Sequence, residues 1–123
     1  MADLERPAAS RNRWLTTLGA VYAAAGIALS AYAAHAAVGG DASRLQTAAL
    51  FAFGHGVALA ALAPGPADRW TFVGLLAIAA GVALFAGSLA ARVALHWPAT
   101  FAPLGGVLLI GGWLVFAIGQ WRR

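Results

Sequence analysis

The sequence predicts an all-α integral membrane protein folded as a four-helix up-down-up-down bundle. Four apolar stretches, each long enough to cross a bilayer, fill the chain almost end to end, and the charged residues lie between them. A bilayer core of about 30 Å is crossed by roughly 20 apolar residues in a helix. Because 62% of the 123 residues are hydrophobic and 10% are charged, no separate soluble domain fits. The predicted spans are residues 14–38, 45–63, 70–95 and 101–121.

The first span follows a polar segment, residues 1–13, which we expect to be a frayed cytoplasmic tail. This beginning is similar to a cleavable signal peptide, since a basic leader precedes an apolar run with small-x-small sites such as Ala34-His35-Ala36. The run of residues 14–38 is longer than the usual h-region of about 7–15 residues, however. We therefore expect it to be retained, which makes residues 14–121 a single transmembrane domain.

Short connections separate the spans. Gly39-Gly40-Asp41-Ala42-Ser43 is predicted to be a turn, residues 64–68 contain two prolines that cannot continue a helix, and residues 97–100 form the third connection. Connections this short force successive helices to lie antiparallel. Pro103 falls in the first turn of the fourth span, where its missing N–H costs little.

The tryptophans agree with these boundaries. Four of them fall at predicted membrane–water interfaces, where an amphipathic ring prefers to lie: Trp14, Trp70, Trp97 and Trp121. Trp113 is in the middle of the fourth span, and we expect it to face lipid or to fill a gap between helices.

The arginines predict the orientation. Six of the eight basic residues fall on one side of the predicted bundle: Arg6, Arg11, Arg13, Arg69, Arg122 and Arg123. Only Arg44 and Arg92 fall on the other. The protein is expected in the cell (inner) membrane. The positive-inside rule then places both termini, including residues 122–123, in the cytoplasm and loops 39–44 and 96–100 on the outer side of that membrane. The arginines do not cluster as a phosphate-binding face, so no nucleic-acid partner is expected. The chain has no cysteine, which excludes disulfides, thiolate metal sites and cysteine nucleophiles.

Small residues recur at helical spacing on three spans, namely Ala48, Ala52, Gly56 and Ala60 on the second, Gly26, Ser30 and Ala34 on the first, and Gly105, Gly112 and Gly119 on the fourth. Lipid tails supply no hydrophobic force between helices, so close backbone approach over small residues is expected to hold them together. Residues 24–31 also resemble residues 79–86, which predicts that the two hairpins are parallel repeats.

His55 is the main candidate for a functional residue, because it falls near the middle of the second span. One interpretation is structural: the imidazole hydrogen-bonds across the bundle to a backbone carbonyl or to a hydroxyl, the candidates being Thr47, Ser30, Ser88 and Tyr22. The other interpretation is a haem or metal ligand, or a proton relay. The first is favoured, because polar contacts between helices are common in membranes.

The remaining candidate polar residues are His35, Ser88, Arg92 and His96. His35, Arg92 and His96 are expected near the outer surface, as a polar cluster joined by Asp41 or Arg44. His35 and His55 differ in predicted depth by about 10 Å, which disfavours a two-histidine haem site. Arg92 is expected to reach the outer headgroups. Ser88 has no adjacent base, and we expect it to bond its own helix carbonyl rather than to act as a nucleophile.

No catalytic group, cofactor or metal site is predicted. No Asp or Glu lies inside a span, which disfavours proton-coupled export of the small multidrug type.

Four blocks of sequence carry a resemblance, in this order: Ala33-Ala34-His35, residues 46–55 with 57–59, residues 84–89, and residues 102–106 with 111–114. Together they resemble the domain-of-unknown-function 423 (DUF423) family of small membrane proteins, which includes transmembrane protein 256. The family usually has Tyr where Phe51 stands and Ser where Ala86 stands, so chemistry at these two positions is not expected. The resemblance implies a four-helix membrane fold with no established activity. His35 and His55 match its histidines, without a catalytic role.

Three functional hypotheses follow. The first is a non-enzymatic accessory or structural component of the membrane, whose partners are the lipid bilayer and either a homo-oligomer or a larger membrane complex. The second is a small-molecule or ion pathway that uses His55. The third is a haem or redox subunit that uses His35 or His55.

Overall fold

The computed structural model describes residues 2–65 and 68–123, with side chains from Asn12 onward. These residues form four helices: α1 (Ala2–His35), α2 (Gly39–Leu62), α3 (Arg69–Leu95) and α4 (Ala102–Trp121). Each contains a segment long and apolar enough to cross a membrane, and in α1 this segment begins at Asn12. The predicted all-α bundle of a multi-pass membrane protein is confirmed.

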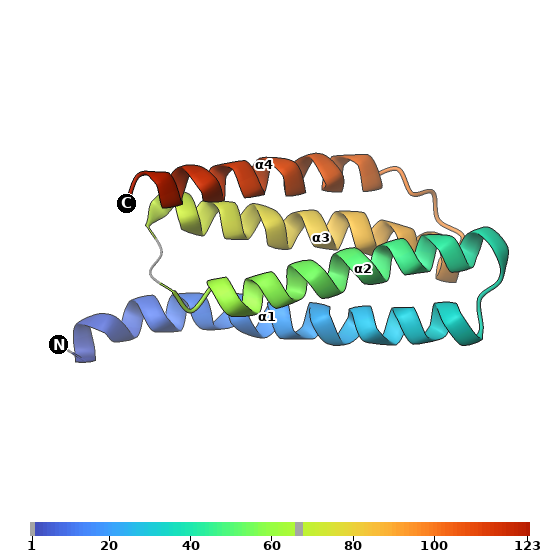
Figure 1. Cartoon of the computed structure of the whole chain (residues 1–123), viewed down its shortest axis with the longest axis horizontal. Coiled ribbons are helices and arrows are strands. Elements are labelled where there is room, and N and C mark those ends of the chain that lie inside the picture. The colour runs from blue at the N-terminus through green and yellow to red at the C-terminus, as the bar shows by residue number, and fades with distance from the viewer. Residues whose placement is uncertain (1, 66–67) are drawn as a thin grey trace.

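Successive helices run antiparallel, and both ends of the chain lie at the same end of the molecule (Figure 1). α1 packs along α2, α3 packs along α4, and the two hairpins meet mainly through α2 and α3. Within the described part of the chain the backbones of α1 and α4 make no contact. The bundle is therefore open, with α1 and α4 at its two edges.

The first helix begins earlier than predicted. α1 starts at Ala2, so the helix runs through the segment of residues 2–13 that the sequence predicts as a frayed tail. That segment is rich in Ala and Arg, which are strong helix formers. Extending an existing helix by such residues costs far less than starting a new one.

The second helix also begins earlier, at Gly39 instead of Leu45. The predicted outer loop of residues 39–44 is therefore wrong, and the chain reverses over residues 36–38. Val38 is extended (φ −130°, ψ 154°), and Gly39 takes a φ of +59°, a conformation that glycine adopts without strain. Asp41 lies in the first turn of α2, where a negative charge is favourable, and pairs with Arg44 at 3.3 Å.

α1 ends at His35, three residues before the predicted end of the first span at residue 38, and the remaining helix boundaries fall within one residue of their predicted positions. Asp68 caps α3 by accepting a hydrogen bond from the backbone N–H of Thr71 at 2.9 Å. α3 ends at Leu95, where His96 takes the left-handed conformation with φ 57° and Pro98 follows. Pro103 lies in the first turn of α4, as predicted. Residues 66 and 67 of the predicted second connection lie outside the described residues.

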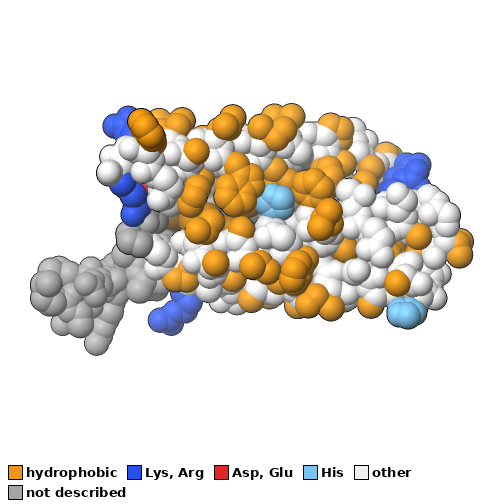
Figure 2. All heavy atoms as spheres, viewed as in Figure 1, with side chains coloured by type: hydrophobic (Ala, Val, Ile, Leu, Met, Phe, Trp, Pro, Cys, Tyr) orange, Lys and Arg blue, Asp and Glu red, His pale blue; other side chains and the backbone are white. Residues whose placement is uncertain are grey.

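The core lies where the two hairpins meet. Its largest fully buried side chains are Leu15, Leu59, Thr71, Leu75, Ile78 and Val82. Ala48 and Ala52, from the row of small residues predicted on the second span, are buried beside them. Many large apolar side chains remain on the outside, and Figure 2 shows them spread over one face, with the arginines toward the two ends. This distribution matches a helix bundle surrounded by lipid.

Glycines bring the helices of the first hairpin into backbone contact. A Cβ atom on Gly19 would come within 2.6 Å of the Gly56 carbonyl oxygen, and one on Gly26 would come within 2.8 Å of the Ala49 carbonyl oxygen. Gly56 is buried, as its row predicts. In the row predicted on the first span, Gly26 is buried whereas Ala34 is exposed. Close approach over glycine therefore holds α1 against α2.

α3 and α4 pack in the same way. A Cβ atom on Gly74 would come within 2.9 Å of the Gly112 carbonyl oxygen, and one on Gly81 within 3.0 Å of the Gly105 carbonyl oxygen. Gly119 is also buried against α3. The prediction that the three regularly spaced glycines of the fourth span form a contact face is therefore confirmed.

The two hairpins form an internal repeat. Positions in the first hairpin make the same contacts as their equivalents in the second. The equivalent positions are Gly19 and Gly74, Gly26 and Gly81, Ala49 and Gly105, and Gly56 and Gly112. α3 therefore follows α1 with an offset of 55 residues, and α4 follows α2 with an offset of 56. The similarity between residues 24–31 and 79–86 has the same offset of 55, so the sequence comparison and the helix contacts agree.

Candidate functional site

His55 lies in the middle of the apolar part of α2. It follows Leu45 by about 15 Å of helix and precedes Ala63 by about 12 Å. Its side chain is half-buried at the surface between α2 and α4. Figure 2 shows a histidine among hydrophobic side chains midway along this face. The polar ring is therefore placed at the depth where a polar group is most costly.

The His55 ring is held by its own helix. Its Nδ1 is 2.9 Å from the carbonyl oxygen of Phe51, one turn earlier. Because a carbonyl oxygen only accepts hydrogen bonds, Nδ1 carries the proton of the neutral ring and donates it. The prediction of a backbone carbonyl as partner is right, but the prediction of a contact across the bundle is wrong. The i−4 carbonyl is within reach of the side chain without any help from another helix.

Two aromatic rings lie against His55. The Phe51 ring is stacked on it, with centroids 5.6 Å apart and planes 9° apart, and the Trp113 ring is tilted toward it at 6.0 Å. Phe51 also contacts Phe85 of α3 at 4.5 Å. Trp113 thus fills the gap between α4 and α2, which is one of the two roles predicted for it.

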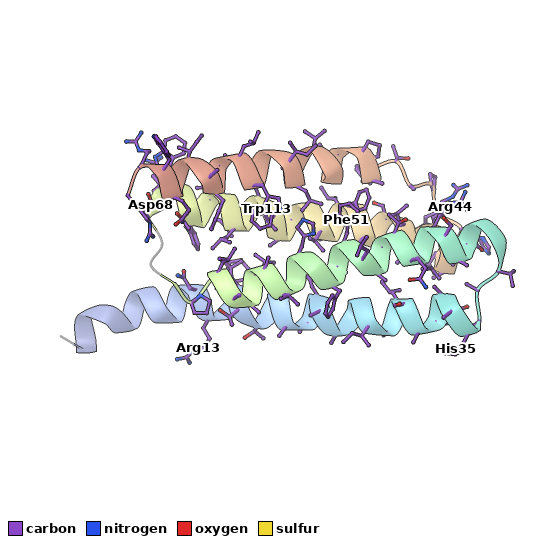
Figure 3. All side chains as sticks on the ribbon, in the orientation of Figure 1. Arg13, His35, Arg44, Phe51, Asp68 and Trp113 are labelled. Carbon is purple, nitrogen blue, oxygen red and sulfur yellow. The ribbon has the colours of Figure 1, made fainter. Side chains whose placement is uncertain are left out.

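A cleft of about 270 Å³, hereafter the His55 cleft, opens between α2 and α4 and is lined by Leu50, Phe51, Gly54, His55 and Trp113. Figure 3 shows Phe51 and Trp113 near each other in the middle of the molecule. A Cβ atom on Gly54 would meet no atom within 4 Å, so this wall of the cleft is open. Among the described residues, the ring of His55 has no hydrogen-bond partner other than Phe51, and its Nε2 is therefore an unused acceptor.

The hydroxyls predicted as partners of His55 are elsewhere. Tyr22 donates to the Ala79 carbonyl oxygen at 2.8 Å and so joins α1 to α3. Ser30 donates to Gln46 at 3.2 Å, and Thr47 donates to the Ser43 carbonyl oxygen of its own helix at 3.1 Å. Ser88 makes no hydrogen bond within the residues that the structure describes, so its predicted bond to a helix carbonyl is absent there.

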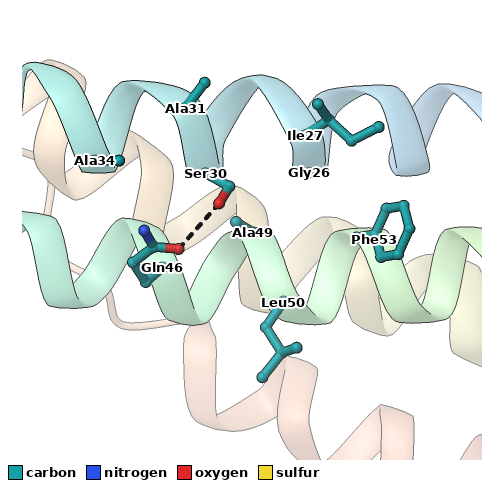
Figure 4. A pocket seen from close by; sticks show the side chains of 9 residues that line it. All are labelled: Gly26, Ile27, Ser30, Ala31, Ala34, Gln46, Ala49, Leu50 and Phe53. Carbon is teal, nitrogen blue, oxygen red and sulfur yellow. Dashed lines mark hydrogen bonds between the residues drawn. The ribbon is translucent and has the colours of Figure 1, made fainter.

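A second groove, of about 520 Å³, lies between α1 and α2 (Figure 4). The Ser30–Gln46 hydrogen bond spans it. Its other walls are apolar or small side chains, namely Gly26, Ile27, Ala31, Ala34, Ala49, Leu50 and Phe53. Gln46 is not among the predicted functional residues, although an amide at the start of an apolar stretch is a signal for a contact between helices.

The predicted outer polar cluster is not joined by contacts. His35 is in the last turn of α1, Arg92 is in the last turn of α3, and His96 caps α3, all of them exposed. In the described residues the only ion pair at this end is Asp41–Arg44. His35 lies at the end of α1, far along the molecule from Phe51 and Trp113 (Figure 3), so the structure does not bring His35 and His55 together.

The opposite end of the bundle holds a polar contact that sequence analysis missed. Gln120 donates to the Thr71 hydroxyl at 3.1 Å, which ties the end of α4 to the start of α3. Hydrogen bonds from the side chain and backbone of Thr71 hold the pKa of Asp68 below its ordinary value of 3.8. The guanidinium of Arg122 lies 5.7 Å from the centre of the Trp70 ring. These contacts fix the hairpin at its open end.

The chain matches a known protein family. The family described as "Protein of unknown function (DUF423)" matches residues 29–106. No curated protein and no solved structure matches the chain. The matched residues run from the second half of α1 to the start of α4 and include His35 and His55. This chain therefore belongs to the DUF423 family, whose function is unknown.

Proposed function

We propose that this protein is a non-enzymatic structural or accessory component of the cell membrane that assembles with further copies of itself. The observation that carries the proposal is the open repeat. α2 packs against α3, whereas α4 and α1, the equivalent helices at the two edges, make no backbone contact with each other within the described residues. A second copy would cover them if its α1 packed on α4 as α3 packs on α2. Such a head-to-tail contact repeats an interface that the fold already contains.

The α2–α3 interface identifies which residues would meet. Phe51 and Phe85 are in ring contact across it. With the offsets of the repeat, their equivalents are Val107 on α4 and Ser30 on α1. Val107 is 66% exposed and is therefore free to contact another chain. The proposed contact therefore places Val107 of one copy beside Ser30 of the next.

Crosslinking in native membranes tests this contact directly. Because the chain has no cysteine, the double variant Ser30→Cys/Val107→Cys introduces the only two thiols. α1 and α4 make no backbone contact within one chain, so an oxidative crosslink between these positions joins two copies. We expect dimers and larger species in the double variant, and monomers in each single variant.

Depth provides the matched control. Val21 is exposed on the same helix as Ser30 but lies nine residues away, or about 14 Å. The pair Val21→Cys/Val107→Cys should crosslink much less. Equal crosslinking by both pairs, or monomers in all variants, would contradict self-assembly through these faces.

The proposed orientation has both termini in the cytoplasm. Support comes from the arginines: Arg13, Arg69, Arg122 and Arg123 are at the end that holds both termini, whereas Arg44 and Arg92 are at the other. The side chains of Arg6 and Arg11 lie outside the described residues. A reporter that is active only in the cytoplasm should be active when fused to the C-terminus. A fusion active only outside contradicts this orientation.

The His55 cleft favours a second candidate function, the binding or passage of a small molecule. A saturable flux into liposomes that His55→Ala abolishes would support passage. A haem or redox subunit would instead show a Soret band in the purified protein, and the same substitution would remove it.

A further inference from the structure

We propose that the His55 cleft binds a membrane-soluble phenolic molecule whose hydroxyl donates a hydrogen bond to Nε2 of His55. The site is formed by the five residues that line the cleft, and it is separate from the faces proposed for self-assembly. The proposal names the ligand class for the second candidate function, the binding of a small molecule in this cleft, and rests on that function.

The repeat shows that His55 is not needed for the glycine contacts that join the two helices of a hairpin. The position equivalent to His55 in the second hairpin is Gly111, and the position equivalent to Trp113 in the first is Val57. Both hairpins nevertheless make the same glycine contacts. His55 is thus found only in the first hairpin and Trp113 only in the second, and their rings meet where α2 faces α4.

The chemistry of the imidazole selects a hydrogen-bond donor. Nδ1–H donates its hydrogen bond to the Phe51 carbonyl oxygen, so Nε2 presents a lone pair and no hydrogen. In the hydrocarbon core no bulk water is present to satisfy that lone pair. A hydroxyl that arrives from the bilayer supplies the missing proton donor, and the resulting hydrogen bond is strong in such apolar surroundings.

The walls of the His55 cleft select a flat apolar body. Phe51 and Trp113 present aromatic rings beside the imidazole, and Leu50 completes an apolar lining. A cavity of about 150 Å³ is known to hold a benzene molecule. The 270 Å³ of the His55 cleft therefore has room for one substituted or fused aromatic ring. The opening at Gly54 faces outward, so such a molecule can enter from the lipid.

A pair of probes that differ only in the hydroxyl tests the proposal. The full chain, labelled with ¹⁵N at its histidines, is titrated in detergent micelles with 1-naphthol and with naphthalene. We expect 1-naphthol to shift the Nε2 resonance of His55 saturably, while those of His35 and His96 stay unchanged and naphthalene has a much smaller effect. In His55→Phe, which keeps an aromatic ring but removes the acceptor, 1-naphthol should bind about three- to tenfold more weakly.

Two leucine variants separate binding from folding. Gly54→Leu places a side chain at the mouth of the cleft and should abolish saturable binding. Gly87→Leu is the control, because a Cβ atom there also meets nothing within 4 Å but lies outside the cleft. Equal affinity for both probes, a His55 shift that never saturates, or equal binding by both leucine variants would overturn the proposal. A Soret band in the purified protein that His55→Phe removes would overturn it in favour of a porphyrin.

Discussion

Gly19 and Gly56 face each other where α1 crosses α2, and neither can carry a side chain. A Cβ atom on Gly56 would come within 2.5 Å of the Gly19 carbonyl oxygen, and one on Gly19 would come within 2.6 Å of the Gly56 carbonyl oxygen. The contact is therefore backbone against backbone. It gains van der Waals energy that larger residues would forfeit by separating the helices.

The substitution Gly56→Leu should push α2 away from α1. The nearest atoms are backbone atoms of Gly19 and Ala23, which cannot move aside as a flexible side chain can. We expect the free energy of unfolding to fall by about 1–3 kcal/mol, as overpacking usually costs. The measurement is unfolding in mixed detergent, followed by circular dichroism. Gly54→Leu, two residues earlier and with no neighbour within 4 Å, is the control and should change stability by less than about 0.5 kcal/mol.

The second hairpin should respond in the same way. Gly112→Leu should destabilise by about as much as Gly56→Leu, because it too meets backbone, at Ile78. The two sites are in different hairpins, so their effects on the free energy of unfolding should add in the double variant within about 0.5 kcal/mol. Gly111→Leu is the matched control, since its Cβ meets nothing within 4 Å. A stable Gly112→Leu would show that the two hairpins do not rely on the same contact.

Much of this packing could be predicted from the sequence, because small residues at helical spacing have few other uses in a membrane. In the row predicted on the second span, Ala48, Ala52 and Gly56 are buried and Ala60 is half-buried, and the three predicted glycines of the fourth span are buried. The start of α2 could not be predicted from the sequence. Gly39, Gly40 and Asp41 have the composition of a turn, but the conformations of Val38 and Gly39 complete the reversal before the helix begins.

The candidate site was predictable only in part. The depth of His55 follows from counting residues along an apolar stretch, and its importance follows from the cost of a polar group in lipid. Its contact with Trp113 on another helix does not follow from the sequence. Trp113 is 58 positions away, and whether it faces lipid or His55 depends on how α4 sits relative to α2, which no local pattern encodes. The same holds for the Tyr22 bond to Ala79.

Removing the Tyr22 hydroxyl tests the contact between the two hairpins. Tyr22→Phe deletes the 2.8 Å hydrogen bond to the Ala79 carbonyl oxygen while keeping the ring. We expect a loss of about 0.5–1.5 kcal/mol in the free energy of unfolding. Tyr32→Phe is the control: Tyr32 is 54% exposed, and its hydroxyl has no hydrogen bond within the described part of the chain. Equal effects of the two substitutions would show that the Tyr22 bond does not stabilise the fold.

Asp68, at the end of the bundle that holds the termini, should make the stability of the protein depend on pH. Its pKa is lowered from 3.8 in the folded state, chiefly by hydrogen bonds from Thr71. A lowered pKa means that the carboxylate stabilises the fold fully above the ordinary value and that this contribution is lost as the pH falls through the folded value. Asp68→Ala should therefore unfold at a lower temperature than the original chain at pH 7, and the difference should shrink below about pH 4. A difference that stays constant down to pH 2.5 would mean that the charge is not involved.

His55 provides the last test, because packing and polarity can be separated there by two substitutions. His55→Ala removes ring contacts with both Phe51 and Trp113, and we expect a loss of about 1 kcal/mol in the free energy of unfolding. His55→Phe keeps a ring in the same place and loses only a hydrogen bond to a carbonyl of its own helix. Its free energy of unfolding should therefore be close to that of the original chain. If the imidazole joined helices through its nitrogens, the phenylalanine variant would be as unstable as the alanine variant. A stable His55→Phe protein would instead show that the imidazole nitrogens have a role other than stabilising the fold.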